Sequence, residues 1–132
     1  MHYRQYLVDE TWDSIADWFT TLVRDGSPMH QFARDILLAA LPDSLVGLEI
    51  LDIGCGEGLI TGALAARGGN ATGIDPTRAL IKHAHDAERD EPVGARYRID
   101  DATTLSTVAD AAADWATAGF VAEQCRRPRR SA

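Results

Sequence analysis

Residues 51–58 read "LDIGCGEG" and place three glycines two residues apart, directly after an apolar run. The run Leu48–Ile53 has a glycine on either side, which is typical of a short strand buried on both faces. A helical pattern, "LITGALAAR", follows at once and ends at Gly68 and Gly69, where a left-handed helix cap is expected. The stretch therefore predicts a strand–loop–helix unit whose loop carries few side chains.

The same alternation continues toward the C-terminus. "NATGID" at 70–75 and "ARYRI" at 95–99 read as two further strands, and "PTRALIKHAHDAE" at 76–88 reads as the helix between them. A β-α-β-α-β order favours a parallel sheet with right-handed crossovers. We therefore expect an α/β fold with a partial parallel sheet of about three to four strands, in which helices cross from strand to strand.

Two helices are expected before the sheet. Apolar residues recur at helical spacing over Thr11–Val23, and Ser27 with Pro28 is typical of the start of a second helix that Pro42 ends. The expected parts are a helical cap region over 1–47, the β-α-β-α-β half over 48–105, and a divergent, disordered tail over 106–132.

Composition narrows the class of protein. A chain of 132 residues has room for one domain. It holds no long apolar window and no signal-peptide pattern, so we expect a soluble protein of the cytoplasm without a membrane partner. The two cysteines, Cys55 and Cys125, are too few for a disulfide framework and fit a reducing compartment.

The charge of the chain argues against nucleic acid as a partner. Residues 1–125 hold nine basic and 20 acidic residues, a net charge of −11, which repels a phosphate backbone. The segment "RRPRR" at 126–130 could bind an anionic partner by itself, but we interpret it as a solvated end of the chain.

The spacing of the glycines separates two classes of nucleotide site. A dinucleotide fingerprint needs Gly-x-Gly-x-x-Gly, but the third position is Leu59 when counted from Gly54, and Thr61 when counted from Gly56. The acid before the loop, Asp52, suits a ligand with a positive charge better than a pyrophosphate.

A second acid lies at the end of the second expected strand. Asp75 comes 21 residues after Gly54, and a carboxylate at that place can accept hydrogen bonds from both hydroxyls of a ribose. A simple strand-end cap is the alternative for Asp75 alone, but its distance from the glycines favours the ribose.

Together these motifs resemble the class I S-adenosylmethionine-dependent methyltransferases of the small-molecule type, which have a Rossmann-like fold. "LDIGCGEG" is similar to their first motif, "GIDPTRALIKHA" at 73–84 to their second, and "YRIDDATTL" at 97–105 to the segment after their third strand. The resemblance covers roughly residues 30–105. It implies S-adenosyl-L-methionine as the cofactor and a small-molecule methyl acceptor as the partner.

The resemblance also implies roles for individual residues. The glycines and Cys55 would contact the methionine and ribose parts of the cofactor, and Asp52 would lie beside its amino group. Asp75 would bind the ribose hydroxyls, and the residues after Asp75 and after the third strand would lie beside the adenine. The cofactor-binding residues so implied are Asp52, Gly54, Cys55, Gly56, Gly58, Asp75, Pro76, Thr77, Asp101 and Ala102. Asp100 stands where the family usually has glycine, which puts the local turn in question. No catalytic residue can be named.

Several residues have competing interpretations. Asp101 alone could be an ordinary turn residue. Cys55 could be a nucleophile, but no histidine stands beside it in the sequence. His83 and His85 are two apart and point to different sides of a helix, so we expect no metal site. Trp18 and the turn at 24–28 are candidates for a lid.

The sequence departs from the family after Leu105. The region is alanine-rich and offers at best a short strand at Phe120–Ala122, so we expect a truncation after the third strand. The first strand would then lose a neighbour, and the exposed edge would promote self-association.

Three functions follow from these observations. The first is methyl transfer from S-adenosylmethionine to a small molecule, impaired by the truncation. The second is a non-catalytic remnant that binds the cofactor or acts as an interaction module. The third, disfavoured by the glycine spacing, is an NAD(P)-binding oxidoreductase.

Overall fold

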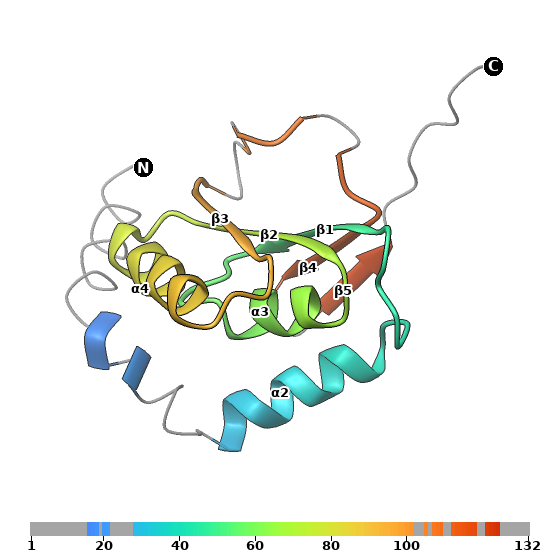
Figure 1. Ribbon diagram of the computed structural model, residues 1–132, viewed down its shortest axis with the longest axis horizontal. Coiled ribbons are helices and arrows are strands. Elements are labelled where there is room, and N and C mark those ends of the chain that lie inside the picture. Colours follow the sequence, from blue (N-terminus) through green and yellow to red (C-terminus); the bar gives the residue numbers. More distant parts are fainter. Residues whose placement is uncertain are drawn as a thin grey trace, which may run out of the picture.

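The structure, a computed structural model, describes residues 16–18, 20, 21, 28–101, 105, 107–109 and 112–118, and the backbone of 121–124. Within these residues lies a five-stranded sheet in the order β3-β2-β1-β4-β5 (Figure 1). The strands are β1 (Glu49–Ile53), β2 (Asn70–Asp75), β3 (Arg96–Ile99), β4 (Trp115–Ala118) and β5 (Val121–Gln124). Strands β1 to β4 are parallel, and β5 pairs antiparallel with β4. The expected α/β fold with a parallel sheet is confirmed.

The labelled helices lie on one side of the sheet, with α2 beyond α3 (Figure 1). They are α2 (Pro28–Ala39), α3 (Leu59–Ala66) and α4 (Arg78–Asp90). Both expected crossover helices are therefore present. α2 begins at the expected proline, and its end is tied to the end of α3 by Arg67, whose Nη1 donates to the Leu38 carbonyl at 2.8 Å.

The face of the sheet toward α3 and α4 carries the hydrophobic core. Ile50, Ala71 and Tyr97 contribute from three adjacent strands and pack with Leu64 from α3 and Ala84 from α4. A fully buried leucine such as Leu64 contributes about 2 kcal/mol through the hydrophobic effect. This core fixes the ends of β1 and β2, from which the candidate site is built.

β4 differs from the expected tail. Its start is fixed against β1 by two hydrogen bonds, from the Asp114 amide to the Glu49 carbonyl at 2.7 Å and from the Glu49 amide to Asp114 Oδ2 at 2.8 Å. Trp115 and Thr117 then pair with residues of β1. The short strand expected at Phe120–Ala122 overlaps β5, whereas β4 is an additional strand that the sequence pattern does not predict. The alanines beside Trp115 and Thr117 obscure its alternating pattern.

The position of β4 also changes which strands form the edges. β1 lies between β2 and β4, so the exposed edge expected beside the first strand is wrong, and the expected self-association has no support there. The segments 115–118 and 121–124 are strands of the sheet, contrary to the expectation of a disordered tail.

The described part of the N-terminal region contacts α4. Residues 16–18 are helical, and Asp17 Oδ1 lies 2.6 Å from Nε2 of His83. Trp18 is exposed, and most of the candidate lid turn falls outside the described residues. No helix among the described residues has the length and apolar character needed to cross a bilayer.

Candidate functional site

The candidate site is built on the loop of residues 54–58, here called the glycine loop, which joins β1 to α3. The amides of Gly54 and Cys55 both donate to the Ile74 carbonyl, at 2.8 and 3.0 Å, so the loop is fastened to the end of β2. Gly54, Gly56 and Gly58 all have positive φ angles, of 71°, 57° and 96°. Side chains other than glycine rarely adopt this conformation, which explains the repeated glycines.

Gly58 is restricted for a second reason. A Cβ at this position would collide with the ring and hydroxyl of Tyr97 from β3. The Tyr97 hydroxyl also donates to the Gly58 carbonyl at 3.4 Å, so the tyrosine holds this end of the loop against β3. At Gly54, by contrast, a Cβ would meet open space, which leaves room for a ligand beside the main chain.

Asp75 lies at the end of β2 and joins the glycine loop to the start of α4. Its Oδ2 accepts the Gly56 amide at 3.0 Å, and its Oδ1 accepts the Thr77 amide at 2.8 Å. Each carboxylate oxygen can accept a further hydrogen bond, so these contacts leave capacity for a ligand. Pro76 beside it is exposed and Thr77 is buried. The structure thus brings the glycines, Asp75 and the residues after it to one edge of the sheet.

Asp52 is placed differently from its expected role beside an amino group. Its side chain is buried, and its two oxygens accept the hydroxyls of Thr61 from α3 at 2.7 Å and of Thr117 from β4 at 2.8 Å. Burial raises the pKa of Asp52 from 3.8 to about 6, the two hydroxyls oppose this rise, and the negative charge of Asp75 adds to it. Asp52 thus lies behind the loop, and its direct contact with a ligand stays a prediction.

The raised pKa of Asp52 predicts a pH-dependent cost of folding. The folded chain binds this proton more tightly than the unfolded chain, so stability falls as pH rises from about 4 to about 6, by about 2–3 kcal/mol. Asp52→Asn removes this titration and can still accept from one threonine and donate to the other. We expect its stability relative to the native chain to increase by that amount between pH 4 and pH 7, measured by urea unfolding. A constant difference across this range would contradict the assignment.

Asp100, the residue that departs from the family pattern, organises the loop after β3. Its carboxylate accepts the Asp101 amide at 2.7 Å and, from Thr107, the amide at 2.8 Å and the hydroxyl at 2.6 Å. The turn that a glycine would make is thus replaced by side-chain hydrogen bonds. Asp101 is half-buried, and Ala102 lies outside the described residues.

Cys55 has the surroundings of a structural thiol. It is buried, and its Sγ lies 3.6 Å from the Gly56 carbonyl. Burial, followed by the negative charges of Asp52 and Asp75, raises the pKa of the Cys55 thiol well above its usual range. Because the thiolate is the reactive form, these surroundings argue against a nucleophile.

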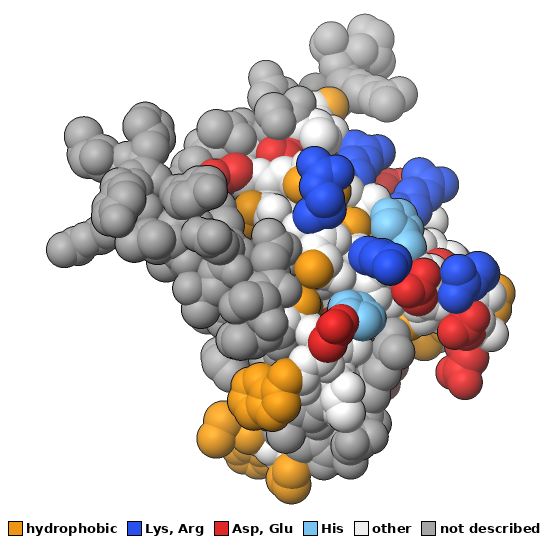
Figure 2. All heavy atoms as spheres, turned by 90° about the vertical axis from the view of Figure 1, so that its left-hand side faces the viewer, with side chains coloured by type: hydrophobic (Ala, Val, Ile, Leu, Met, Phe, Trp, Pro, Cys, Tyr) orange, Lys and Arg blue, Asp and Glu red, His pale blue; other side chains and the backbone are white. Residues whose placement is uncertain are grey.

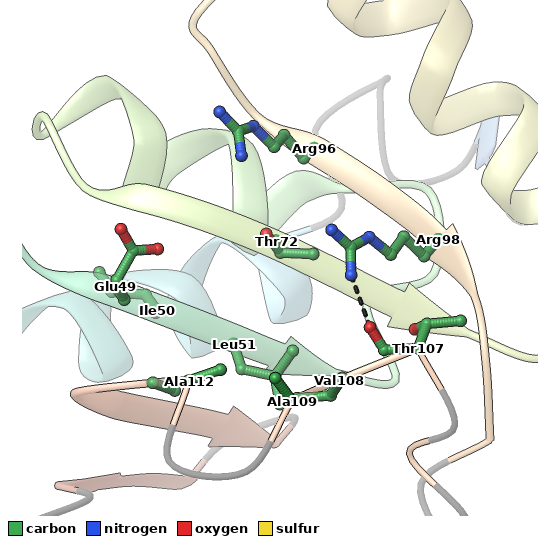
Figure 3. A pocket seen from close by; sticks show the side chains of 11 residues that line it. Glu49, Ile50, Leu51, Thr72, Arg96, Arg98, Thr107, Val108, Ala109 and Ala112 are labelled. Atoms are coloured by element: carbon green, nitrogen blue, oxygen red, sulfur yellow. Dashed lines mark hydrogen bonds between the residues drawn. The ribbon is translucent and has the colours of Figure 1, made fainter. Parts of the chain in front are cut away.

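Two hollows lie away from the glycine loop. One of about 240 Å³ lies on the sheet face opposite α3 and α4, where Figure 3 shows Arg96, Arg98 and Thr72 and the hydrogen bond from Arg98 to the Thr107 carbonyl. The other, of about 340 Å³, includes Arg78 and Lys82 of α4, on the face where Figure 2 shows basic side chains gathered. Neither contains a predicted cofactor-binding residue, so the candidate site rests on the geometry of the loop.

The sequence did not reveal the supporting residues of the site. In the sequence, Thr61 is informative only because a glycine is absent there, and Thr117 lies 65 residues from its partner Asp52. Tyr97 reads as an ordinary strand residue until the packing of β3 places it under Gly58. Only Asp100 gave a signal, as the departure from a glycine. Among the described residues, no group of three His, Cys, Asp or Glu side chains is arranged to hold a metal ion.

Comparisons with known proteins agree with this arrangement. A family model described as "Methyltransferase domain" matches residues 51–132, which includes the segment that we expected to be divergent. The chain is 42% identical over 79 residues to the mitochondrial ubiquinone biosynthesis O-methyltransferase of Homo sapiens, covering 51% of this chain and 21% of that protein. It is 43% identical over 64 residues to the magnesium-protoporphyrin O-methyltransferase of Rhodobacter capsulatus, covering 48% of this chain and 27% of that protein. The chain thus spans about a fifth to a quarter of the length of these relatives.

Solved structures show the same fold. A phosphoethanolamine N-methyltransferase of Haemonchus contortus, in complex with phosphoethanolamine and S-adenosylhomocysteine, superposes with a TM-score of 0.69 at 19% identity, covering 86% of this chain and 24% of that one. A TehB-like SAM-dependent methyltransferase of Corynebacterium glutamicum gives a TM-score of 0.59 at 26% identity, covering 85% and 54%.

Proposed function

The chain belongs to the methyltransferase domain family, and we propose that it binds S-adenosylmethionine at the glycine loop and directs the methyl group to an oxygen of a small-molecule acceptor. The acceptor class is supported by the names of the relatives, which are O-methyltransferases of small molecules. A cytoplasmic location is part of the proposal, because the free Cys55 fits a reducing compartment.

One observation carries the proposal: the glycine loop and Asp75 are held together at the carboxyl edge of the parallel strands. Asp75 fixes the loop through the Gly56 amide and α4 through the Thr77 amide. Ligands of open α/β sheets bind at this edge, beyond the ends of the strands. The open space above Gly54 lets a ligand approach the main chain closely.

The proposed residue roles are those that the family resemblance implies. Asp75 would accept the ribose hydroxyls, with Pro76 and Thr77 beside the adenine. Asp101 and Ala102, after β3, would complete the adenine side. Gly54, Cys55, Gly56 and Gly58 would contact the methionine and ribose.

Methyl transfer requires the chain mainly to bind and orient the cofactor. S-adenosylmethionine supplies a methyl group that its positively charged sulfur has already activated. The glycine loop and Asp75 fix the orientation of the ligand, because both are hydrogen-bonded to their neighbours before it binds. Held in this way, the loop loses little conformational freedom on binding.

The dinucleotide alternative is disfavoured by a contact in the structure. In the register that starts at Gly56, the position that a dinucleotide fingerprint would need as glycine is Thr61, whose side chain is buried and donates its hydroxyl to Asp52. The site therefore uses this side chain for support instead of leaving the position bare.

Calorimetric titration of the purified chain tests the proposal. We expect S-adenosylhomocysteine to bind and NADH not to bind. Transfer of a labelled methyl group from S-adenosylmethionine to simple phenols then tests catalysis. Binding without transfer to any acceptor would favour a non-catalytic cofactor-binding module, and binding of NADH alone would reject the proposal.

A further inference from the structure

Three buried side chains form a network directly behind the glycine loop. Asp52 accepts hydroxyl hydrogen bonds from Thr61 at 2.7 Å and Thr117 at 2.8 Å. Asp52 is 3% exposed and both threonines are 0% exposed. Because the three come from β1, α3 and β4, the network joins the strand before the loop to the helix after it and to the neighbouring strand.

The network holds a negative charge that no basic side chain neutralises within the described part of the chain. Asp75, a further buried carboxylate beside the loop, accepts backbone amides, and neither it nor Asp52 forms an ion pair with any described Lys or Arg. The charge of Asp75 is one of the causes of the raised pKa of Asp52, so the two carboxylates repel each other. A cation bound at the loop would relieve both the burial cost and this repulsion.

We propose that Thr61 and Thr117 are positioning residues that hold Asp52 as a carboxylate behind the loop, and that this charge makes the site favour cationic S-adenosylmethionine over its product. The inference rests on the proposed function. S-adenosylmethionine carries a sulfonium charge that S-adenosylhomocysteine lacks, so the negative site attracts the two ligands unequally. Such a preference would favour release of the product after transfer.

The preference depends on pH because Asp52 is half-protonated near pH 6. As pH rises through this value, Asp52 becomes negatively charged. The affinity for S-adenosylmethionine, which carries the sulfonium charge, then rises relative to the affinity for S-adenosylhomocysteine. Asp75, Glu57, Cys55 and Tyr97 are the other titratable groups around the loop. Burial raises the pKa values of Cys55 and Tyr97, so both stay uncharged over this range.

The test measures dissociation constants of both ligands at pH 5, 6 and 7. In the native chain we expect the affinity ratio of S-adenosylmethionine to S-adenosylhomocysteine to rise by roughly fivefold from pH 5 to pH 7. In Asp52→Asn the affinity ratio should be low and independent of pH, which would identify Asp52 as the group responsible for the pH dependence.

The threonine variants test the positioning role. Thr117→Val removes one hydrogen bond to the Asp52 carboxylate and so raises its pKa further. The midpoint, the pH at which the affinity ratio has made half of its change, should therefore be higher than in the native chain. Thr117→Ser keeps the hydroxyl and should restore the native midpoint. A structural role alone would alter stability without moving this midpoint. If Thr117→Val fails to fold, Thr117→Ser and Asp52→Asn still test whether the pH dependence of the affinity ratio comes from Asp52.

The outcomes separate this inference from the proposed function. Binding of both ligands with a ratio that does not change with pH, or that changes equally in Asp52→Asn, would overturn the inference and leave cofactor binding intact. Binding of neither ligand by the folded chain at any pH would overturn the proposed function and the inference with it.

Discussion

Replacing Gly58 by alanine is expected to destabilise the protein by about 2–4 kcal/mol and to abolish measurable binding of S-adenosylhomocysteine. The φ angle of 96° is unfavourable for any residue with a Cβ, and the new methyl group would occupy the space of the Tyr97 ring. Relief of the clash requires Tyr97 or the loop to move. Tyr97 is buried in the core, so the loop is the part that will shift, and the hydrogen bond from Gly56 to Asp75 will be strained.

A matched control exists four residues away. Gly62 lies within α3, and a Cβ at this position meets nothing within 4 Å. Gly62→Ala should therefore be neutral or stabilise the protein by up to about 1 kcal/mol, because alanine favours the helix. Urea unfolding compares the two variants, and titration with S-adenosylhomocysteine follows binding. Equal stability of Gly58→Ala and the native chain would show that the loop tolerates a side chain and that the packing against Tyr97 is not restrictive.

The parts of the fold that could be predicted from the sequence depend on local signals. The apolar run before Gly54 and the helical spacing after Gly58 are both contained in a few residues, so β1, the glycine loop and α3 follow from sequence alone. β4 is not recognisable in the sequence because its signal is limited to Trp115 and Thr117 among alanines. Its position is decided instead by the pairing of Asp114 with Glu49, which are 65 residues apart.

The candidate site shows the same division. The glycines and Asp75 are recognisable because their spacing along the chain is set by one strand, one helix and the next strand. The partners of Asp52 are not recognisable, because a threonine hydroxyl in a neighbouring strand leaves no pattern in the sequence around Asp52. A buried acid signals only that some partner must exist.

Replacing Asp75 by alanine is expected to weaken S-adenosylhomocysteine binding by about 100-fold or more. The proposed contacts are two ribose hydroxyls donating to a carboxylate, and each hydrogen bond to a charged group contributes about 1.5–3 kcal/mol. The variant also leaves the Gly56 and Thr77 amides without their acceptor, so we expect a loss of stability of about 1–3 kcal/mol. Calorimetry at constant pH measures the first effect and urea unfolding the second.

Two further variants separate ligand binding from support of the loop. Asp75→Asn keeps one carbonyl oxygen for the backbone amides but loses the charge and half of the acceptor capacity, so binding should fall further than stability does. Asp90→Asn, at the exposed end of α4, removes a charge at a distance from the loop and should leave binding and stability within about 0.5 kcal/mol of the native values. If Asp75→Asn bound as tightly as the native chain while Asp75→Ala lost binding, Asp75 would act through the backbone of the loop alone, and the ribose contact would have to be assigned to another residue.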